Sequence, residues 1–272
     1  MTEPDQYAVI GHPISHSKSP IIHQLFAQLT GEAITYDALD VPPEKLAESL
    51  QKFAYSGGCG LNVTVPHKQQ ALMLMDDLSD RAKLAGAVNT ITVLENGELR
   101  GDNTDGIGLI TDLRDNLNIE LLDSSILILG AGGAARGIVP PLLEQKPAEL
   151  IIANRTIEKA NALANVFIDK GNIAASSYNA LEGRVFHLII NATSAGLTGK
   201  VAPFPASILR PETICYDLSY SMNDTPFINW AKQNGCQKTY QGWGMLVEQA
   251  AESFNIWRGI RPDTSTVRAQ LP

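Results

Sequence analysis

A glycine-rich turn in the middle of the chain constrains the fold more than any other segment. An apolar run, Ile126–Leu129, leads into Gly130, Gly132 and Ala135 at the spacing G-x-G-x-x-A, and a helical pattern follows over Gly133–Glu144. In this fingerprint the first glycine allows a tight turn, and the second lets the backbone approach a pyrophosphate. The free N–H groups at the helix start favour an anion. Strand, turn and helix together predict a dinucleotide-binding unit.

Segments with strand-like and helix-like patterns alternate along nearly all of the 272 residues. Repeated βα units predict parallel sheets with helices on both faces, so the expected fold class is α/β. Strands are expected at Tyr7–Gly11, Ile34–Val41, Gly60–Val65, Ile126–Leu129, Leu150–Ala153, His187–Asn191, Thr213–Asp217 and Lys238–Tyr240, with an Asn-Gly hairpin joining Ala87–Leu94 to Leu99–Gly101. Helices are expected from Ser19 (as N-cap), at Pro43–Tyr55, from about His67, and at Asp105–Leu117, Gly133–Glu144, Thr156–Lys170, Thr225–Asn234 and Gly244–Trp257.

The composition is that of a packed globular protein, with 44% hydrophobic and 18% charged residues. A net charge of −8 argues against nucleic acid as a main partner, but not against small anions, which need only a few local cations. The cysteines, Cys59, Cys215 and Cys236, form no CxxC pair, which favours free thiols in a reducing cytoplasm. We expect no signal peptide in the polar first residues, no membrane-spanning run and no metal site.

The end of the strand after the glycine-rich turn selects between the two common dinucleotides. An NAD site usually has a carboxylate there, whereas this chain has Asn154, Arg155 and Thr156. Arg155 can pair with a 2′-phosphate in a forked geometry, and Lys159 adds a second cation in the first turn of the next helix. The alternative is a solvated Arg and Lys, although cations at a helix start oppose its dipole unless an anion offsets them. The pattern predicts NADP(H).

A further parallel strand ends at Asn191–Gly196, and ligands bind at the carboxyl ends of such strands. Cofactor contact at Thr193 is one interpretation of this segment, and a simple capped turn is the other.

Two other stretches each place a charged residue just beyond a strand. Lys68 follows the strand in Asn62–Lys68 and begins a helix, and Asp105 begins a helix after Gly101–Thr104. Each alone would be a surface residue. Together with Thr64, Asn89 and Asn103, which also lie at element ends, they favour a small polyol-binding site.

Such a pair suits carbonyl reduction, which needs a proton donor to the oxygen as hydride reaches the carbon. His67 is the rival donor, but as the helix neighbour of Lys68 it should point elsewhere.

With these motifs taken together, the chain resembles the shikimate dehydrogenase family. The stretches that carry the resemblance are Gly11–Pro20, Asn62–Lys68, Ala85–Thr90, Gly101–Gly106, Gly130–Ala134, Asn154–Thr156, Asn191–Thr193 and Gly242–Ala250. They span nearly the whole chain in the family's order. The resemblance implies reversible NADPH-dependent reduction of 3-dehydroshikimate to shikimate, a cytoplasmic step toward chorismate and the aromatic amino acids.

The resemblance also implies roles for single residues. Lys68 would be the acid/base group with Asp105 as its partner. The resemblance leaves open which of these two residues carries the transferred proton. The substrate would contact Ser17, Ser19, Thr64, Lys68, Asn89, Asp105, Tyr220 and Gln249. The cofactor would contact Gly130, Ala131, Gly132, Gly133, Ala134, Asn154, Arg155, Thr156, Lys159, Thr193, Leu218 and Gly242.

Two of these positions could instead have purely structural roles, since Ser19 is also a good N-cap and Gln249 suits an exposed helix. Lys159 stands where many relatives carry a second arginine, which leaves the strictness of NADP preference open.

The family's fold implies two α/β domains with a cleft that closes on substrate. A parallel-sheet substrate domain would take residues 1–104 plus 242–272, and a Rossmann-like NADP domain would take residues 105–241. This arrangement agrees with the mid-chain position of the glycine-rich turn. Monomer and homodimer both remain open.

Three other functions are compatible with parts of this sequence pattern. A broader quinate/shikimate dehydrogenase is the nearest, although relatives of that kind that use NAD would be expected to have a carboxylate near Arg155. A non-catalytic NADPH-binding regulator is the second, and the presence of Lys68 and Asp105 argues against it. A nucleotide-binding domain of unknown substrate would explain the glycine-rich turn but leaves Asn62–Lys68 without a reason.

Overall fold

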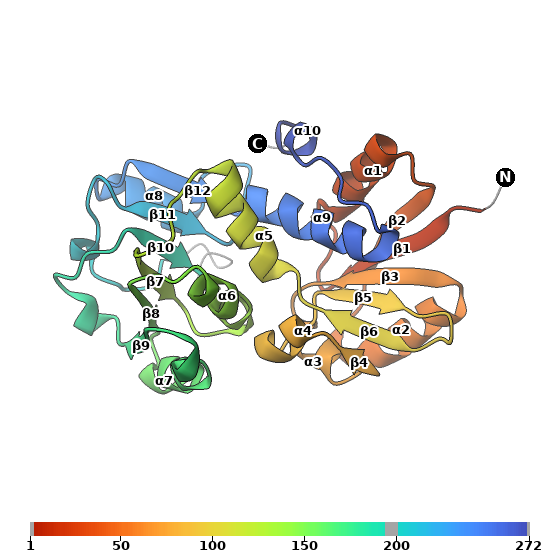
Figure 1. Ribbon diagram of the computed structural model, residues 1–272, viewed down its shortest axis with the longest axis horizontal. Coiled ribbons are helices and arrows are strands. Elements are labelled where there is room, and N and C mark those ends of the chain that lie inside the picture. Colours follow the sequence, from red (N-terminus) through yellow and green to blue (C-terminus); the bar gives the residue numbers. More distant parts are fainter. Residues whose placement is uncertain (1–2, 194–200, 271–272) are drawn as a thin grey trace. The chain divides into compact units, whose positions relative to one another are not determined.

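The computed structural model describes residues 3–193 and 201–270 (Figure 1). The chain forms two compact units: unit 1 contains residues 1–108 and 246–271, and unit 2 contains residues 109–245. Both divisions fall inside helices, within α5 (Asp105–Thr111) and within α9 (Trp243–Arg258). Each lies four residues beyond the boundary expected from the sequence.

Unit 1 is built on a six-stranded sheet in the order β2-β1-β3-β5-β6-β4. Its strands are β1 (Asp5–Gly11), β2 (Ile34–Asp40), β3 (Gly58–Val63), β4 (Asp77–Leu78), β5 (Thr90–Val93) and β6 (Leu99–Asp102). The first three are parallel, as predicted, but β5 runs antiparallel to both β3 and β6. The sheet is therefore mixed rather than wholly parallel, because strands joined by a short Asn-Gly turn can pair only antiparallel.

Alternation along β1 assigns helices to the two faces of this sheet. Ala8 and Ile10 join a core that includes residues of α2 (Leu46–Tyr55), whereas Tyr7 and Val9 face the opposite way, toward Trp257 of α9. On that second side, α9 packs its apolar residues against Ile22 and Phe26 of α1 (Ser19–Thr30). The helices α3 (Lys68–Leu72), α4 (Asp80–Ala85) and α10 (Ser265–Arg268) complete the unit.

Unit 2 has a wholly parallel sheet in the order β12-β11-β10-β7-β8-β9. Its strands are β7 (Ser125–Leu129), β8 (Glu149–Ala153), β9 (Ile173–Ser176), β10 (Leu188–Asn191), β11 (Ile214–Asp217) and β12 (Lys238–Gln241). Counted from β7, this is the doubly wound order 6-5-4-1-2-3 of the Rossmann fold. The strand order reverses between β7 and β10, and ligands of such sheets bind outside the strand ends at this switch point.

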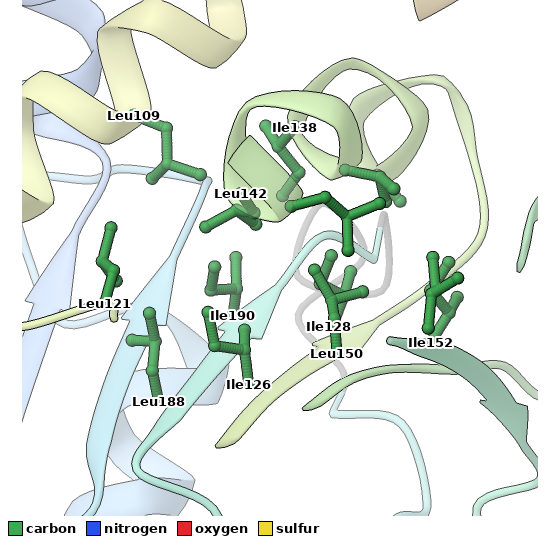
Figure 2. Close-up of a cluster of buried hydrophobic side chains, with 14 of the residues drawn as sticks. Leu109, Leu121, Ile126, Ile128, Ile138, Leu142, Leu150, Ile152, Leu188 and Ile190 are labelled. Carbon is green, nitrogen blue, oxygen red and sulfur yellow. The ribbon is translucent and has the colours of Figure 1, made fainter. Parts of the chain in front are cut away.

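The core of unit 2 explains why its strands are continuous apolar runs. Side chains at alternate positions of β7, Ile126 and Ile128, face α6 (Gly133–Glu144) and α7 (Ile157–Val166). Figure 2 shows them grouped with Ile138 and Leu142 of α6 and with side chains of β8 and β10. Leu127 and Leu129 face the other way, toward α8 (Pro226–Gln233). Both faces are buried, as parallel sheets require.

The structure departs from the sequence-based expectations at several short elements. The N-cap of α1 is Lys18 rather than Ser19, which is the first helical residue, and no side chain caps this helix. The segment expected as one helix over Asp105–Leu117 continues past Thr111 as a π-helical turn, Asp112–Asn116. Among the α-helices and strands of the described residues, four were not predicted: β4, α4, β9 and α10. In the described part of the chain, no helix has the length and apolar character needed to cross a membrane.

Candidate active site

Lys68 and Asp105 form an ion pair within unit 1, with 2.5 Å between Lys68 Nζ and Asp105 Oδ2. Each is the first residue of its helix, α3 or α5, and each helix follows the end of a strand of the same sheet. The lysine side chain is 27% exposed and the aspartate side chain 11%. The pair is therefore shielded from water on most sides, yet the amine is still reachable by a small molecule.

The second carboxylate oxygen of Asp105 is held by a side-chain amide. Asn89 Nδ2 lies 2.9 Å from Asp105 Oδ1 and 3.2 Å from Oε1 of Gln249, a residue of α9. The backbone N–H of Asp105 donates to the Asn103 side chain at 3.1 Å. The structure thus brings four of the predicted substrate residues, Lys68, Asn89, Asp105 and Gln249, into one connected cluster.

His67 does not compete with Lys68 as a proton donor. Its side chain is fully buried, and its Nε2 atom lies 2.7 Å from the carbonyl oxygen of Val41. The ring therefore points away from the Lys68–Asp105 pair, as expected from the sequence.

The remaining predicted substrate residues lie in three places. In unit 1, the backbone N–H of Ser19 donates to Ser17 Oγ at 3.3 Å, and Thr64 is half-buried just after β3. Tyr220 belongs to unit 2, where its ring lies 4.4 Å from the Trp243 ring, centroid to centroid. Burial raises the pKa of Tyr220, so its hydroxyl is a neutral donor near pH 7.

Several polar residues behind this cluster were not predicted from the sequence. Asn62, Thr90, Thr104 and Ser253 are all buried and hydrogen-bonded to one another or to Asn89. The hydroxyl of Tyr36 donates to Asn62 Oδ1 at 2.7 Å. Asn62 and Thr90 lie in strands, Thr104 lies just before α5, and Ser253 lies in α9. A polar side chain at such a position indicates a buried polar network only once its partners are known.

The glycine-rich turn of unit 2 has the backbone that a dinucleotide site needs. Gly130 has φ of +107°, and a Cβ there would lie 2.9 Å from the Ala192 carbonyl oxygen. Gly132 is the N-cap of α6, and no atom of the described residues would lie within 4 Å of its Cβ. Packing in the described protein therefore explains Gly130 but not Gly132, whose bare backbone leaves room for a ligand at the helix N-terminus.

The end of β8 carries cations and no carboxylate. Asn154 Nδ2 donates to the backbone carbonyl of Thr156 at 2.9 Å, and Arg155 and Lys159 are both exposed. Among the described residues, neither cation has an ion-pair partner within 4.0 Å. The exposed guanidinium of Arg155 and ammonium of Lys159 suit a phosphate on the ribose.

Thr193 follows β10 at the switch point and caps Asn191, donating from Oγ1 to Asn191 Oδ1 at 2.8 Å. Asn191 donates in turn to the buried Asp217, where burial raises the pKa of the carboxyl and hydrogen bonds, including one from Thr225, oppose the rise. Beside this strand end, a Cβ on Gly242 would collide with the Leu218 carbonyl oxygen. Residues 194–196 of the predicted capped turn lie outside the described residues. Among the residues that the structure describes, no cluster of His, Cys, Asp or Glu side chains could hold a metal ion.

Three family models match the chain in succession. The shikimate dehydrogenase substrate binding domain matches residues 9–91, shikimate / quinate 5-dehydrogenase matches residues 113–198, and the shikimate 5′-dehydrogenase C-terminal domain matches residues 242–271.

Individual proteins match over nearly the full length. The chain is 52% identical over 267 residues to shikimate dehydrogenase (NADP(+)) of Methylococcus capsulatus, covering 98% of this chain and 96% of that one. A crystal structure of an Ael1 enzyme from Pseudomonas putida gives a TM-score of 0.92 at 45% identity, covering 98% of both chains. That of shikimate 5-dehydrogenase from Thermus thermophilus in complex with NADP(H) and shikimate gives 0.87 at 35% identity, covering 97% of both. The chain therefore belongs to the shikimate dehydrogenase family.

Proposed function

We propose that this protein catalyses the reversible NADPH-dependent reduction of 3-dehydroshikimate to shikimate. The observation that carries the proposal is the Lys68–Asp105 pair in a half-buried polar cluster, within a chain that belongs to the shikimate dehydrogenase family. Unit 1 contains most of the proposed substrate residues, and unit 2 contains the proposed cofactor residues. The reaction is a step in the biosynthesis of aromatic amino acids.

Lys68 is the acid/base group of the proposed mechanism. When bound, the nicotinamide supplies or removes the hydride at the ring carbon. A lysine ammonium has three N–H donors, and Asp105 Oδ2 accepts one of them, which leaves the others for a substrate oxygen. In the reductive direction Lys68 donates a proton to the carbonyl oxygen, and in the oxidative direction it accepts the hydroxyl proton.

Asp105 has two tasks in this mechanism. It fixes the flexible four-carbon side chain of Lys68 in one place, which removes rotamer freedom before substrate arrives. It also balances the ammonium charge in a site where little water reaches. Asn89 and Gln249, which contact this carboxylate or each other, present amide groups suited to ring hydroxyls. Ser17, Ser19, Thr64 and Tyr220 offer hydroxyl groups for the substrate carboxylate and ring.

Unit 2 has the residues to hold NADP(H). The N-terminus of α6 beyond Gly130–Ala134 supplies N–H groups for the pyrophosphate. Arg155, with Lys159 one helical turn later, suits the 2′-phosphate, and Asn154 and Thr156 shape the same strand end. Thr193, Leu218 and Gly242 lie at the ends of neighbouring parallel strands.

Activity on quinate is the second candidate, because the family model over residues 113–198 is described as shikimate / quinate 5-dehydrogenase. Quinate differs from shikimate by an extra ring hydroxyl. The amide groups of Asn89 and Gln249 can hydrogen-bond ring hydroxyls of either compound.

The proposed compartment is the cytoplasm. Its support is the three cysteines, all of them free thiols, as expected in a reducing environment.

The deciding experiment measures initial rates of the purified protein with shikimate or quinate, each with NADP⁺ or NAD⁺, by the absorbance of the reduced cofactor. Fast turnover with shikimate and NADP⁺ alone is the expected result. Comparable rates with quinate or NAD⁺ would move the protein to the broader quinate/shikimate group. Cofactor binding without turnover in any combination would contradict the proposal and favour a regulator or another substrate.

A further inference from the structure

Ser253 of α9 is the centre of a buried hydrogen-bond network beside the Lys68–Asp105 pair. Its side chain is fully buried, and it accepts a hydrogen bond from Asn62 Nδ2 at 2.9 Å. Its Oγ lies 2.8 Å from Thr90 Oγ1 and 3.3 Å from Thr104 Oγ1. A serine with only a helix-forming role would need none of these contacts, because its hydroxyl already has a backbone acceptor, the Gln249 carbonyl, at 3.0 Å.

The amide of Asn89 can take only one orientation in this network. The backbone N–H of Thr104 lies 2.8 Å from the atom assigned as Asn89 Oδ1, and a backbone N–H can only donate, so that atom is the oxygen. The NH₂ group therefore faces Asp105, where an ionised carboxylate can only accept. The reversed amide would set oxygen against carboxylate and N–H against N–H.

Asn62 is oriented by the same argument. Its Nδ2 lies 3.2 Å from the backbone carbonyl oxygen of Asn89, which can only accept, so this group is the donor. Its oxygen accepts from the Tyr36 hydroxyl. Asn62 therefore donates to Ser253 Oγ, and the single proton of Ser253 has two acceptors within reach, Thr90 Oγ1 at 2.8 Å and the Gln249 carbonyl oxygen at 3.0 Å.

These constraints give the network a direction. Thr90 donates to Asn89 Oδ1 at 2.9 Å, and in this arrangement Ser253 uses its proton on Thr90 at 2.8 Å rather than on the Gln249 carbonyl at 3.0 Å. The sequence of donors then runs from Ser253 to Thr90, from Thr90 to Asn89 and from Asn89 to Asp105, which also accepts from Lys68. Each bond polarises the next, so the series strengthens the last contact on the carboxylate.

We infer that Ser253 is a positioning residue, which acts through Thr90 to hold Asn89 against Asp105 and so keeps the carboxylate in place for Lys68. Ser253 lies in the C-terminal segment of unit 1, far along the chain from the residues it positions. Among the described residues it makes no hydrogen bond to the ion pair, and it contacts the proposed substrate residue Gln249 at the backbone carbonyl. This inference rests on the proposed function, because its consequence is measured as turnover of shikimate.

The test uses Ser253→Ala, Thr90→Val and the double variant in the full-length protein. Each single variant should lower kcat with shikimate and NADP⁺ roughly tenfold, with KM for NADP⁺ unchanged, because one hydrogen bond in the series is lost. The double variant should lose little more than either single variant, because the two hydroxyls act in series. Ser124→Ala is the matched control: it removes a buried serine hydroxyl bonded at 2.7 Å to a backbone carbonyl, that of Leu121, but in unit 2.

The outcomes separate this inference from the proposed function. An inactive wild-type protein would overturn the proposed function and the inference with it. An active wild type with kcat of Ser253→Ala within twofold of normal would overturn the inference alone. Multiplying losses in the double variant would also overturn it. A kcat loss in Ser124→Ala as large as in Ser253→Ala would assign the effect to general destabilisation, which thermal unfolding of every variant would reveal. If Ser253→Ala does not fold, Thr90→Val decides alone: normal turnover contradicts the inference.

Discussion

The two ligand-binding regions of this protein differ in whether their polar groups already have partners within the protein. In unit 1, the polar atoms around Lys68 and Asp105 are already paired with one another, from the ion pair back to Ser253. In unit 2, the glycine-rich turn leaves helix N–H groups, bare backbone at Gly132 and the exposed cation of Arg155 without partners among the described residues.

The difference follows from what each region has to do. A proton-transfer site gains from groups fixed before the substrate arrives, because ordering them later would raise the barrier. A cofactor site gains from unfilled donors and charges, because the bound phosphates supply the missing partners and the binding energy. Changes in unit 1 should therefore appear mainly in kcat, and changes in unit 2 mainly in cofactor affinity.

The largest expected effect comes from Lys68→Ala. We expect kcat to fall roughly a hundredfold or more, with a smaller change in KM, because general acid help is typically of that size. Steady-state kinetics with shikimate and NADP⁺ measure it. Lys45→Ala, which removes an exposed lysine paired with Glu48, is the control and should leave kcat unchanged. Near-normal kcat in Lys68→Ala would remove this residue from the chemistry and break the comparison.

Arg155→Ala tests the other side of the comparison. We expect the Kd for NADP⁺ to rise about ten- to a hundredfold while the Kd for NAD⁺ changes little, because only NADP⁺ has the 2′-phosphate. Titration calorimetry with both cofactors measures the split, and Lys159→Ala should give a smaller shift in the same direction. Equal losses for the two cofactors would contradict the phosphate role.

Substitution of the two glycines of the turn distinguishes a glycine required by protein packing, Gly130, from one required for ligand binding, Gly132. Gly130→Ala should destabilise the protein by about 1–3 kcal/mol, because a side chain there is strained by the positive φ and meets the Ala192 carbonyl. Gly132→Ala should change stability by less than about 1 kcal/mol, since its Cβ would meet no described atom. It should nevertheless weaken NADP⁺ binding at least tenfold. Chemical denaturation and cofactor titration of both variants measure this, and intact binding in Gly132→Ala would contradict it.

The sequence predicts the nucleotide region well because its signals are local. The strand Ile126–Leu129, the turn and the helix Gly133–Glu144 are contiguous, and the structure has the helix with these bounds. The wholly parallel sheet of unit 2 follows from repeated βα units. The missed elements, such as β4 with its two residues, are too short to show a period.

The site in unit 1 could be predicted only in part, because it is assembled over long sequence separations. Lys68 and Asp105 are visible as charges at element ends, but nothing local indicates that Asn89 links Asp105 to Gln249, which is 160 residues beyond Asn89. Ser253 has the pattern of an ordinary buried helix residue. The N-cap assignment of Ser19 was wrong because a favourable cap residue does not determine where the helix begins, which here is one residue earlier.

The remaining prediction concerns His23, which lies beside the polar network of unit 1 and affects stability only at acidic pH. Its ring is fully buried and stacks on Tyr36 with centroids 4.1 Å apart, and neither ring nitrogen has a hydrogen-bond partner among the described residues. Burial lowers the pKa of His23 to about 3, whereas the unfolded chain titrates near 6.5. Between these values the unfolded state binds a proton that the folded state does not.

Stability should therefore fall as the pH drops below 6.5, by about 1.4 kcal/mol per pH unit from this residue. His23→Phe keeps an aromatic ring without titratable nitrogens, so it should remove that part of the acid sensitivity and gain about 2 kcal/mol over wild type at pH 5, relative to pH 7.5. Urea unfolding at both pH values measures the difference, with the exposed His16→Gln as control. The same acid loss in wild type and His23→Phe would mean that His23 is protonated in the folded protein. The network of unit 1 would then have a charged ring at its edge. Unit 1 would in that case also contain a cation without a partner among the described residues, as unit 2 does at Arg155.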